Sequence, residues 1–108
     1  MTASSTGAST VLEVRGEVDL HSAAQLRDRL LKVIAAGRQL VVVDLTGLSF
    51  LDSTGLGVLV AARNEAQQAG AALRLVCPSD RMLKLFRITG LDAVFEIYAT
   101  LPAAISAG

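Results

Sequence analysis

Two hydrophobic periods alternate along the chain. Segments 22–36, 53–69 and 79–89 repeat their apolar residues every three or four positions, which is typical of amphipathic helices packed on a core. Each of these segments is followed by a glycine, the residue preferred just beyond a helix. A shorter helix is expected over 101–107, because Pro102 suits a first helical turn. The pattern therefore predicts about four helices. On the first of them, the face expected to be buried comprises Ala23, Leu26, Leu30, Val33 and Ile34.

Strand-like segments fill the gaps between these helices. Segments 40–45 and 73–77 are nearly continuous apolar runs, which indicates inner strands covered on both faces. Segment 94–98 is short and is expected at an edge. Segment 11–18 alternates apolar and polar residues, which indicates a strand near an edge with one face in water. Strands that alternate with helices predict an α/β domain whose sheet is mixed but mostly parallel, with four to five strands.

The first ten residues, "MTASSTGAST", show neither period. We expect residues 1–10 to form a flexible polar tail and residues 11–108 to form one domain. A chain of 108 residues, of which 52% are hydrophobic, has the size and composition of a single globular domain.

Charge and hydropathy exclude several classes of partner. Ten basic and ten acidic residues cancel, and no run of Lys or Arg suggests a nucleic-acid surface. The longest apolar stretches fall far short of the ~20 residues that cross a bilayer. The N-terminus lacks the basic and apolar regions of a secretory signal, and the single cysteine, Cys77, excludes an internal disulfide. We expect a soluble cytoplasmic protein that binds neither nucleic acid nor a membrane.

Residue types for catalysis and metal binding are scarce. His21 is the one histidine, and neither HExxH nor CxxC occurs. We therefore expect no catalytic residue, no metal and no cofactor. A phospho-receiver domain shares the α/β alternation, and Glu17 and Asp19 could supply its acidic pair. That class also needs a lysine late in the chain, and because segment 94–102 has none, we reject it.

The segment "FLDSTGL", residues 50–56, joins a strand-like run to the second helix and carries an acid and two hydroxyls. Asp52 or Ser53 can cap this helix, as Ser22 can cap the first one. A serine at this place can also be phosphorylated, because free N–H groups and the helix dipole tolerate an added dianion. In α/β sheets, functional loops gather at the carboxyl ends of the strands, where this segment and "EVDLHS" are both expected.

Three stretches carry a resemblance to a known family. "VVVDLTGLSFLDSTGLGVLV" resembles the signature of the anti-sigma-factor antagonists, the bacterial branch of the STAS domain family. "VRGEVDLHSAAQLRDRL" is similar to the G-E-x-D segment that precedes the first helix in that family. "LRLVCPSDRMLKLFRITGLDAVFEIYATLPAAI" resembles its C-terminal third. The resemblance covers roughly residues 11–105 and implies a single STAS-like domain over 11–108.

The resemblance also implies a function. Proteins of this family bind an anti-sigma factor in their unphosphorylated form and thereby release a sigma factor. The anti-sigma factor is commonly a serine/threonine kinase, and a serine phosphatase reverses its action. By position, the resemblance makes Ser53 the phosphorylated residue and places Asp19 beside it. The residues that the resemblance and their position make candidates for partner binding are Asp19, Leu20, His21, Ser22, Asp52, Ser53, Thr54, Gly55 and Leu56.

Alternatives remain open at this point. A STAS domain can bind a protein or a nucleotide without being phosphorylated, and the sequence does not say whether Thr54 is modified too. Leu20, Leu56 and Val58 could meet a partner or pack inward. Asp44 is expected to order the loop that follows it, and Cys77 is expected to be a buried small apolar residue rather than a redox sensor.

Overall fold

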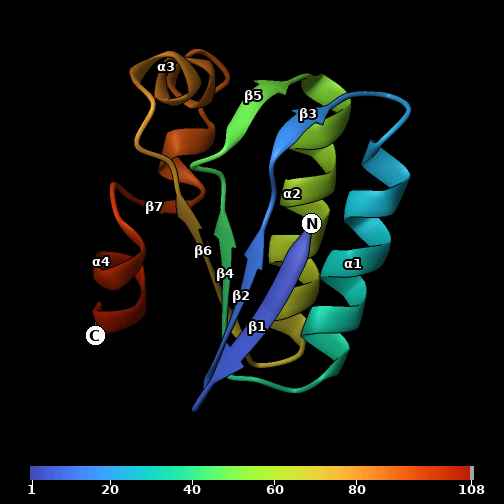
Figure 1. Cartoon of the computed structure of the whole chain (residues 1–108), viewed down its shortest axis with the longest axis vertical. Coiled ribbons are helices and arrows are strands. Elements are labelled where there is room, and N and C mark those ends of the chain that lie inside the picture. Colours follow the sequence, from blue (N-terminus) through green and yellow to red (C-terminus); the bar gives the residue numbers. More distant parts are fainter. Residues whose placement is uncertain (108) are drawn as a thin grey trace.

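The computed structural model of the chain describes residues 1–107, and its centre is a five-stranded mixed sheet (Figure 1). The first two strands pair antiparallel, and every other pairing is parallel. The strands, in their order across the sheet, are β1 (Thr2–Thr6), β2 (Ser9–Glu13), β4 (Leu40–Asp44), β6 (Ala72–Val76) and β7 (Glu96–Tyr98). The predicted mixed, mostly parallel α/β sheet is therefore confirmed.

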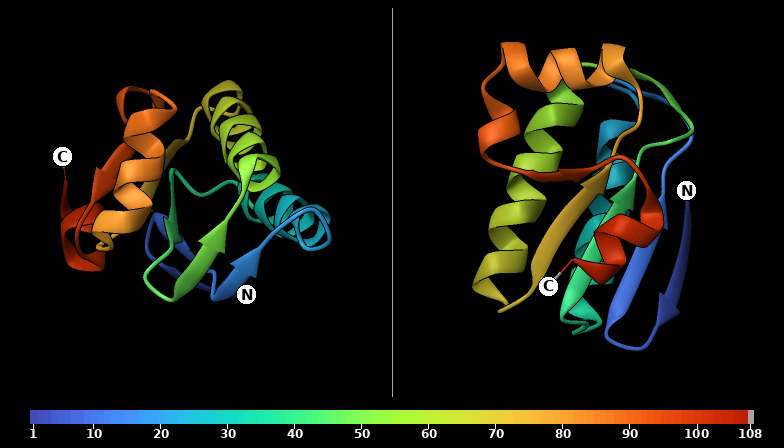
Figure 2. Two further views of the ribbon diagram at one scale, coloured as in Figure 1. Left: turned by 90° about the horizontal axis from the view of Figure 1, so that it is seen from above. Right: turned by 90° about the vertical axis from the view of Figure 1, so that its left-hand side faces the viewer.

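The helices cover both faces of this sheet. Helices α1 (Ala23–Ala35) and α2 (Ser53–Gln68) lie side by side on one face, and the short α4 (Leu101–Ser106) lies on the other (Figures 1 and 2). Helix α3 (Asp80–Ile88) lies at the carboxyl end of the sheet and leads into the 3-10 turn η1 (Leu91–Ala93). The four predicted helices are confirmed, and the five residues predicted for the buried face of α1 are all buried.

The central strand β4 contains an unbroken run of valines because both of its faces are buried. Val41 and Val43 belong to the large core under α1 and α2, whereas Val42 packs with Ala104 of α4 on the opposite face. All three valines are fully buried. Among residues 1–107, no helix combines the length and the hydrophobicity that a membrane crossing requires.

The expected flexible tail over residues 1–10 is wrong, because residues 2–6 form the edge strand β1 and Ser9 and Thr10 already belong to β2. Gly7 has φ +57° and turns the chain back into β2. Arg29 donates to the carbonyl of Met1 at 2.9 Å, and Arg38 donates to the carbonyl of Gly7 at 2.7 Å. The strand has no apolar pattern because backbone pairing and these arginines, rather than a buried face, hold it in place.

The chain between β2 and α2 also differs from the prediction. The expected strand over 11–18 is two strands, because Gly16 has φ +80° and breaks the extended run. Its second half, β3 (Gly16–Val18), pairs in parallel with β5 (Leu48–Leu51), which is not among the four strand segments that we predicted. This two-stranded sheet extends beyond the carboxyl end of the main sheet, and the two candidate loops follow directly from it (Figure 1).

Candidate functional site

The start of α2 is built by Asp52. Its backbone is extended, with φ −100° and ψ −177°, and its carboxylate accepts the N–H of Gly55 at 3.0 Å. Its carbonyl accepts the N–H of Leu56, also at 3.0 Å. Of the two candidates for the cap, the structure therefore selects Asp52, which leaves the side chain of Ser53 free of that role.

Both hydroxyl residues that follow are exposed. Ser53 and Thr54 occupy the first turn of α2, where backbone N–H groups have no partner within the helix. In the part of the chain that the structure describes, neither of their N–H groups donates to a protein acceptor. The helix dipole adds positive potential at this end. The site therefore offers two accessible hydroxyls where negative charge is well tolerated.

The neighbouring loop is organised around the carboxylate of Asp19. Its Oδ1 accepts the N–H of His21 at 2.9 Å and the N–H of Ser22 at 3.1 Å. The bond from Ser22, in particular, holds the pKa of Asp19 below its ordinary value, so the group stays charged near neutral pH. Ser22 is the N-cap residue of α1, as predicted, but its side chain accepts no N–H group of the first turn. That hydroxyl instead accepts from the N–H of Asp19 and donates to the carbonyl of Glu17, while Asp19 receives the N–H groups that precede α1.

Strand pairing brings the two loops together. Val18 pairs with Leu51 in the β3–β5 sheet, and the N–H of Asp52 donates to the carbonyl of Val18 at 3.2 Å. Asp19 directly follows Val18, and Ser53 directly follows Asp52, so the two candidate residues are next to the residues that this hydrogen bond joins. The predicted proximity of the first loop and the second helix start is therefore present in the fold.

Gly55 allows this close packing. An ideal Cβ at Gly55 would lie 2.5 Å from Leu51 Cδ1 and 2.8 Å from Val18 Cγ1, both closer than packed carbon atoms come. The first turn of α2 can rest on β3 and β5 only because residue 55 has no side chain.

The structure divides the candidate partner-binding residues into three groups. Leu20, His21, Ser53 and Thr54 are exposed, and Asp19, Ser22 and Asp52 are half-buried. Gly55 and Leu56 are buried, so they support the site from beneath and present no surface to a partner. Of the three apolar candidates, Leu20 is 70% exposed, whereas Leu56 packs inward and Val58 is half-buried.

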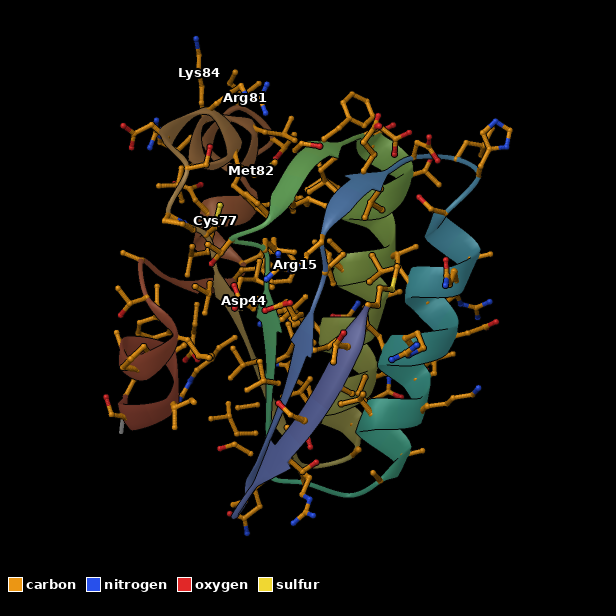
Figure 3. The ribbon with its side chains drawn as sticks, in the orientation of Figure 1. Arg15, Asp44, Cys77, Arg81, Met82 and Lys84 are labelled. Atoms are coloured by element: carbon orange, nitrogen blue, oxygen red, sulfur yellow. The ribbon has the colours of Figure 1, made fainter. Side chains whose placement is uncertain are left out.

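Two other residues singled out in the sequence have structural roles. Asp44 accepts from the N–H of Thr46 at 3.0 Å and from its hydroxyl at 2.6 Å, which fixes the start of the loop before β5 (Figure 3). Cys77 is a buried free thiol, and burial raises its pKa, so the reactive thiolate is disfavoured.

Sequence reasoning missed one exposed aromatic side chain near the site. Phe50 lies in β5 and is 46% exposed, although a large apolar residue in a short strand would ordinarily be assigned to the core. The alternation of apolar and polar residues could not have shown this, because β5 has only four residues.

Removing the Asp52 cap is expected to weaken the start of α2. Asp52→Ala should lower the free energy of unfolding by about 1 kcal/mol, since the N–H of Gly55 loses its acceptor. Asp52→Asn should retain most of that stability, because an asparagine oxygen caps equally well. Urea unfolding of both variants measures the difference. Equal losses in the two variants would show that charge, rather than capping, is what matters.

Comparison with known proteins agrees with this geometry. The family model of the STAS domain matches residues 1–104. The anti-sigma-B factor antagonist of Bacillus subtilis is 38% identical over 88 residues, covering 82% of this chain and 80% of its own. That of Listeria monocytogenes is 41% identical over 85 residues, covering 78% of this chain and 74% of its own.

Solved structures give the same result. An anti-sigma factor antagonist from Mycobacterium paratuberculosis superposes with a TM-score of 0.84 at 28% identity, over 97% of this chain and 89% of the other. The Bacillus cell-fate determinant SpoIIAA in its phosphorylated form superposes with a TM-score of 0.72 at 28% identity, over 96% and 95%. The chain therefore belongs to the STAS domain family, in which the relatives named above are anti-sigma factor antagonists.

Proposed function

We propose that this protein is an anti-sigma factor antagonist whose binding is switched off by phosphorylation of Ser53. In the unphosphorylated form it binds an anti-sigma factor with serine kinase activity and so frees a sigma factor. A serine phosphatase restores that form. The observation that carries the proposal is the exposed hydroxyl of Ser53 at the start of α2, beside the charged loop of Asp19.

The acceptor needs little chemistry of its own. The kinase supplies Mg-ATP and a base that takes the proton of the Ser53 hydroxyl. The serine oxygen then bonds to the γ-phosphorus as the bond to the β-phosphate oxygen breaks, which yields phosphoserine and ADP. The substrate has only to present the hydroxyl in a fixed place, and a helix start capped by Asp52 does this.

Phosphorylation would act on the surface rather than on the fold. The phosphate adds about −1.5 to −2 charges beside the carboxylates of Asp19 and Asp52. Two free N–H groups and the helix dipole at the start of α2 accommodate it without distortion. A partner that presents acidic groups to these loops would then be repelled, and like charges in contact cost several kcal/mol.

The relatives support this proposal. SpoIIAA, similar to this chain over 96% of its length, has been solved in both a phosphorylated and an unphosphorylated form. The curated relatives from Bacillus subtilis and Listeria monocytogenes are named anti-sigma-B factor antagonists.

Mass spectrometry after a kinase reaction tests the proposal. The protein is incubated with ATP and with each candidate anti-sigma factor kinase of its own organism, and any phosphate is located by peptide fragmentation. We expect phosphate on Ser53 in the wild type and in Thr54→Ala, and none in Ser53→Ala. Phosphate on Thr54 alone would refute the assignment of Ser53. Binding of an anti-sigma factor without any phosphorylation would favour an unphosphorylated STAS binding module.

A further inference from the structure

An apolar groove lies next to the candidate site, between β5 and α3. Its volume is about 300 Å³, and it is open to solvent. The apolar side chains that line it are Phe50, Leu51, Met82, Leu85 and Ile88. Phe50 is 46% exposed and Ile88 is 72% exposed, so two of the four most exposed large hydrophobic side chains of residues 1–107 lie on this groove. Two large apolar side chains exposed on one groove favour burial against a partner, which makes the groove a candidate docking surface.

The charged side chains that line the groove are both cations. Arg81 and Lys84 project from α3, and Lys84 extends away from the body of the molecule (Figure 3). The guanidinium of Arg81 donates to the carbonyl of Ser49 at 2.7 Å, which ties α3 to β5 and fixes one positive charge at the groove. The loops of Asp19 and Asp52 carry the opposite sign. The two neighbouring surfaces therefore recognise different chemistry.

The shape and charge together point to an occupant. A protein helix in contact with a groove buries side chains spaced three and four residues apart. The nine residues of α3 make about two and a half turns, which sets the length of helix that the groove can contact. Cations at the rim favour a partner helix whose flanking residues are acidic. A lipid surface fits less well, because a flat membrane cannot fill a hollow and the groove itself offers two cations only.

We infer that the groove between β5 and α3 is a docking site for an acidic amphipathic helix of a partner protein. Apolar side chains of that helix enter between Phe50 and Ile88, and its carboxylates pair with Lys84 and Arg81. This inference goes beyond the proposed function and does not require phosphorylation of Ser53. Because β5 runs from the groove directly to the start of α2, the occupant would lie beside whatever binds the loops of Asp19 and Ser53.

A pair of synthetic peptides tests this inference. One is an amphipathic helix of leucine and glutamate, and its counterpart has lysine in place of every glutamate. Each is titrated into the isotope-labelled full chain at low salt, and amide shifts are followed by NMR. We expect the acidic peptide to shift residues of β5 and α3 and to bind about tenfold or more tightly than the basic one. Equal binding of the two peptides, or shifts confined to another face, would overturn the inference.

Matched variants locate the contact. Ile88→Ser and Lys84→Glu should each weaken binding of the acidic peptide about fivefold or more. Ile105→Ser, at a side chain 41% exposed on α4, and Lys32→Glu, on α1, make the same chemical changes elsewhere and should leave it unchanged. Unaltered affinity in the two groove variants would exclude the groove.

Other occupants give distinct results in the same assay. Stronger shifts of β5 and α3 with anionic phospholipid vesicles than with the acidic peptide would replace the inference with membrane binding. Shifts that depend on protein concentration alone would replace it with self-association. Failure of Ser53 phosphorylation would affect none of these readouts, so the inference and the proposed function fail separately.

Discussion

Replacing Gly55 with alanine is expected to destabilise the protein by about 1–3 kcal/mol, although alanine is the better helix former. The added methyl group would lie 2.8 Å from Val18 Cγ1 and 2.5 Å from Leu51 Cδ1. Both side chains are buried, and Val18, being β-branched, has little rotamer freedom to move aside. The first turn of α2 must therefore shift away from β3 and β5. Urea unfolding followed by circular dichroism measures the loss.

Gly57, two residues further along α2, provides the control. It is exposed, and an added Cβ would meet nothing within 4 Å. Gly57→Ala should therefore stabilise the protein by about 0.5–1 kcal/mol through helix propensity alone. The two substitutions are chemically identical and lie in one helix, so opposite signs isolate the packing of the first turn. If both variants were stabilised, the side chains of Leu51 and Val18 would have to move aside at little cost. The close packing at residue 55 would then not be what positions the site.

The main sheet and the helices could be predicted because hydrophobic periodicity reports burial. The buried face of α1 was recovered residue by residue, since all five residues predicted for it are buried. The continuous run of β4 correctly indicated cover on both sides, which α2 and α4 provide. The short β7 lies at an edge, as its length and position suggested.

The strands that were missed bury too little to leave a pattern. β1 is a polar edge strand whose described side chains are exposed, and backbone hydrogen bonds to β2 hold it. β5 has only four residues, two of them exposed. A sequence pattern records which side chains avoid water, and it carries no direct trace of a strand stabilised by its backbone. The same limit explains why residues 11–18, with Gly16 among them, were predicted to form one strand.

The meeting of the two candidate loops was predicted in outline, but their hydrogen bonds were not. Two loops at the carboxyl ends of strands were expected to meet, and the β3–β5 pairing brings them together. Ser22 is the N-cap residue of α1, yet the carboxylate of Asp19 accepts the N–H groups of the turn before this helix, which depends on backbone geometry that residue type alone does not fix. Leu20 and Leu56 are the same amino acid, yet one is exposed and the other lies in the core, because only Leu56 faces the sheet.

Ser53→Glu is expected to weaken binding of the anti-sigma factor about 100-fold or more, which corresponds to about 2.7 kcal/mol. The carboxylate places a permanent charge near those of Asp19 and Asp52, where a docked partner would meet all three. The free energy of unfolding should change by less than about 1 kcal/mol, since an acidic side chain is favourable in a first helical turn. Titration calorimetry measures the affinity, and urea unfolding measures the stability.

Two further variants separate local charge from other causes. Ser53→Ala removes the hydroxyl without adding charge, so it should bind with wild-type affinity and resist the kinase. Asn64→Asp adds the same charge at an exposed position further along α2 and should leave the affinity unchanged, because screening by salt weakens interactions over such a separation. A loss of binding in Ser53→Ala equal to that in Ser53→Glu would mean that the hydroxyl itself contacts the partner. A loss of stability in Ser53→Glu of several kcal/mol would mean that the switch works by unfolding the helix start. Weak binding by Ser53→Glu alone, with the fold intact, is the result that a purely electrostatic switch requires.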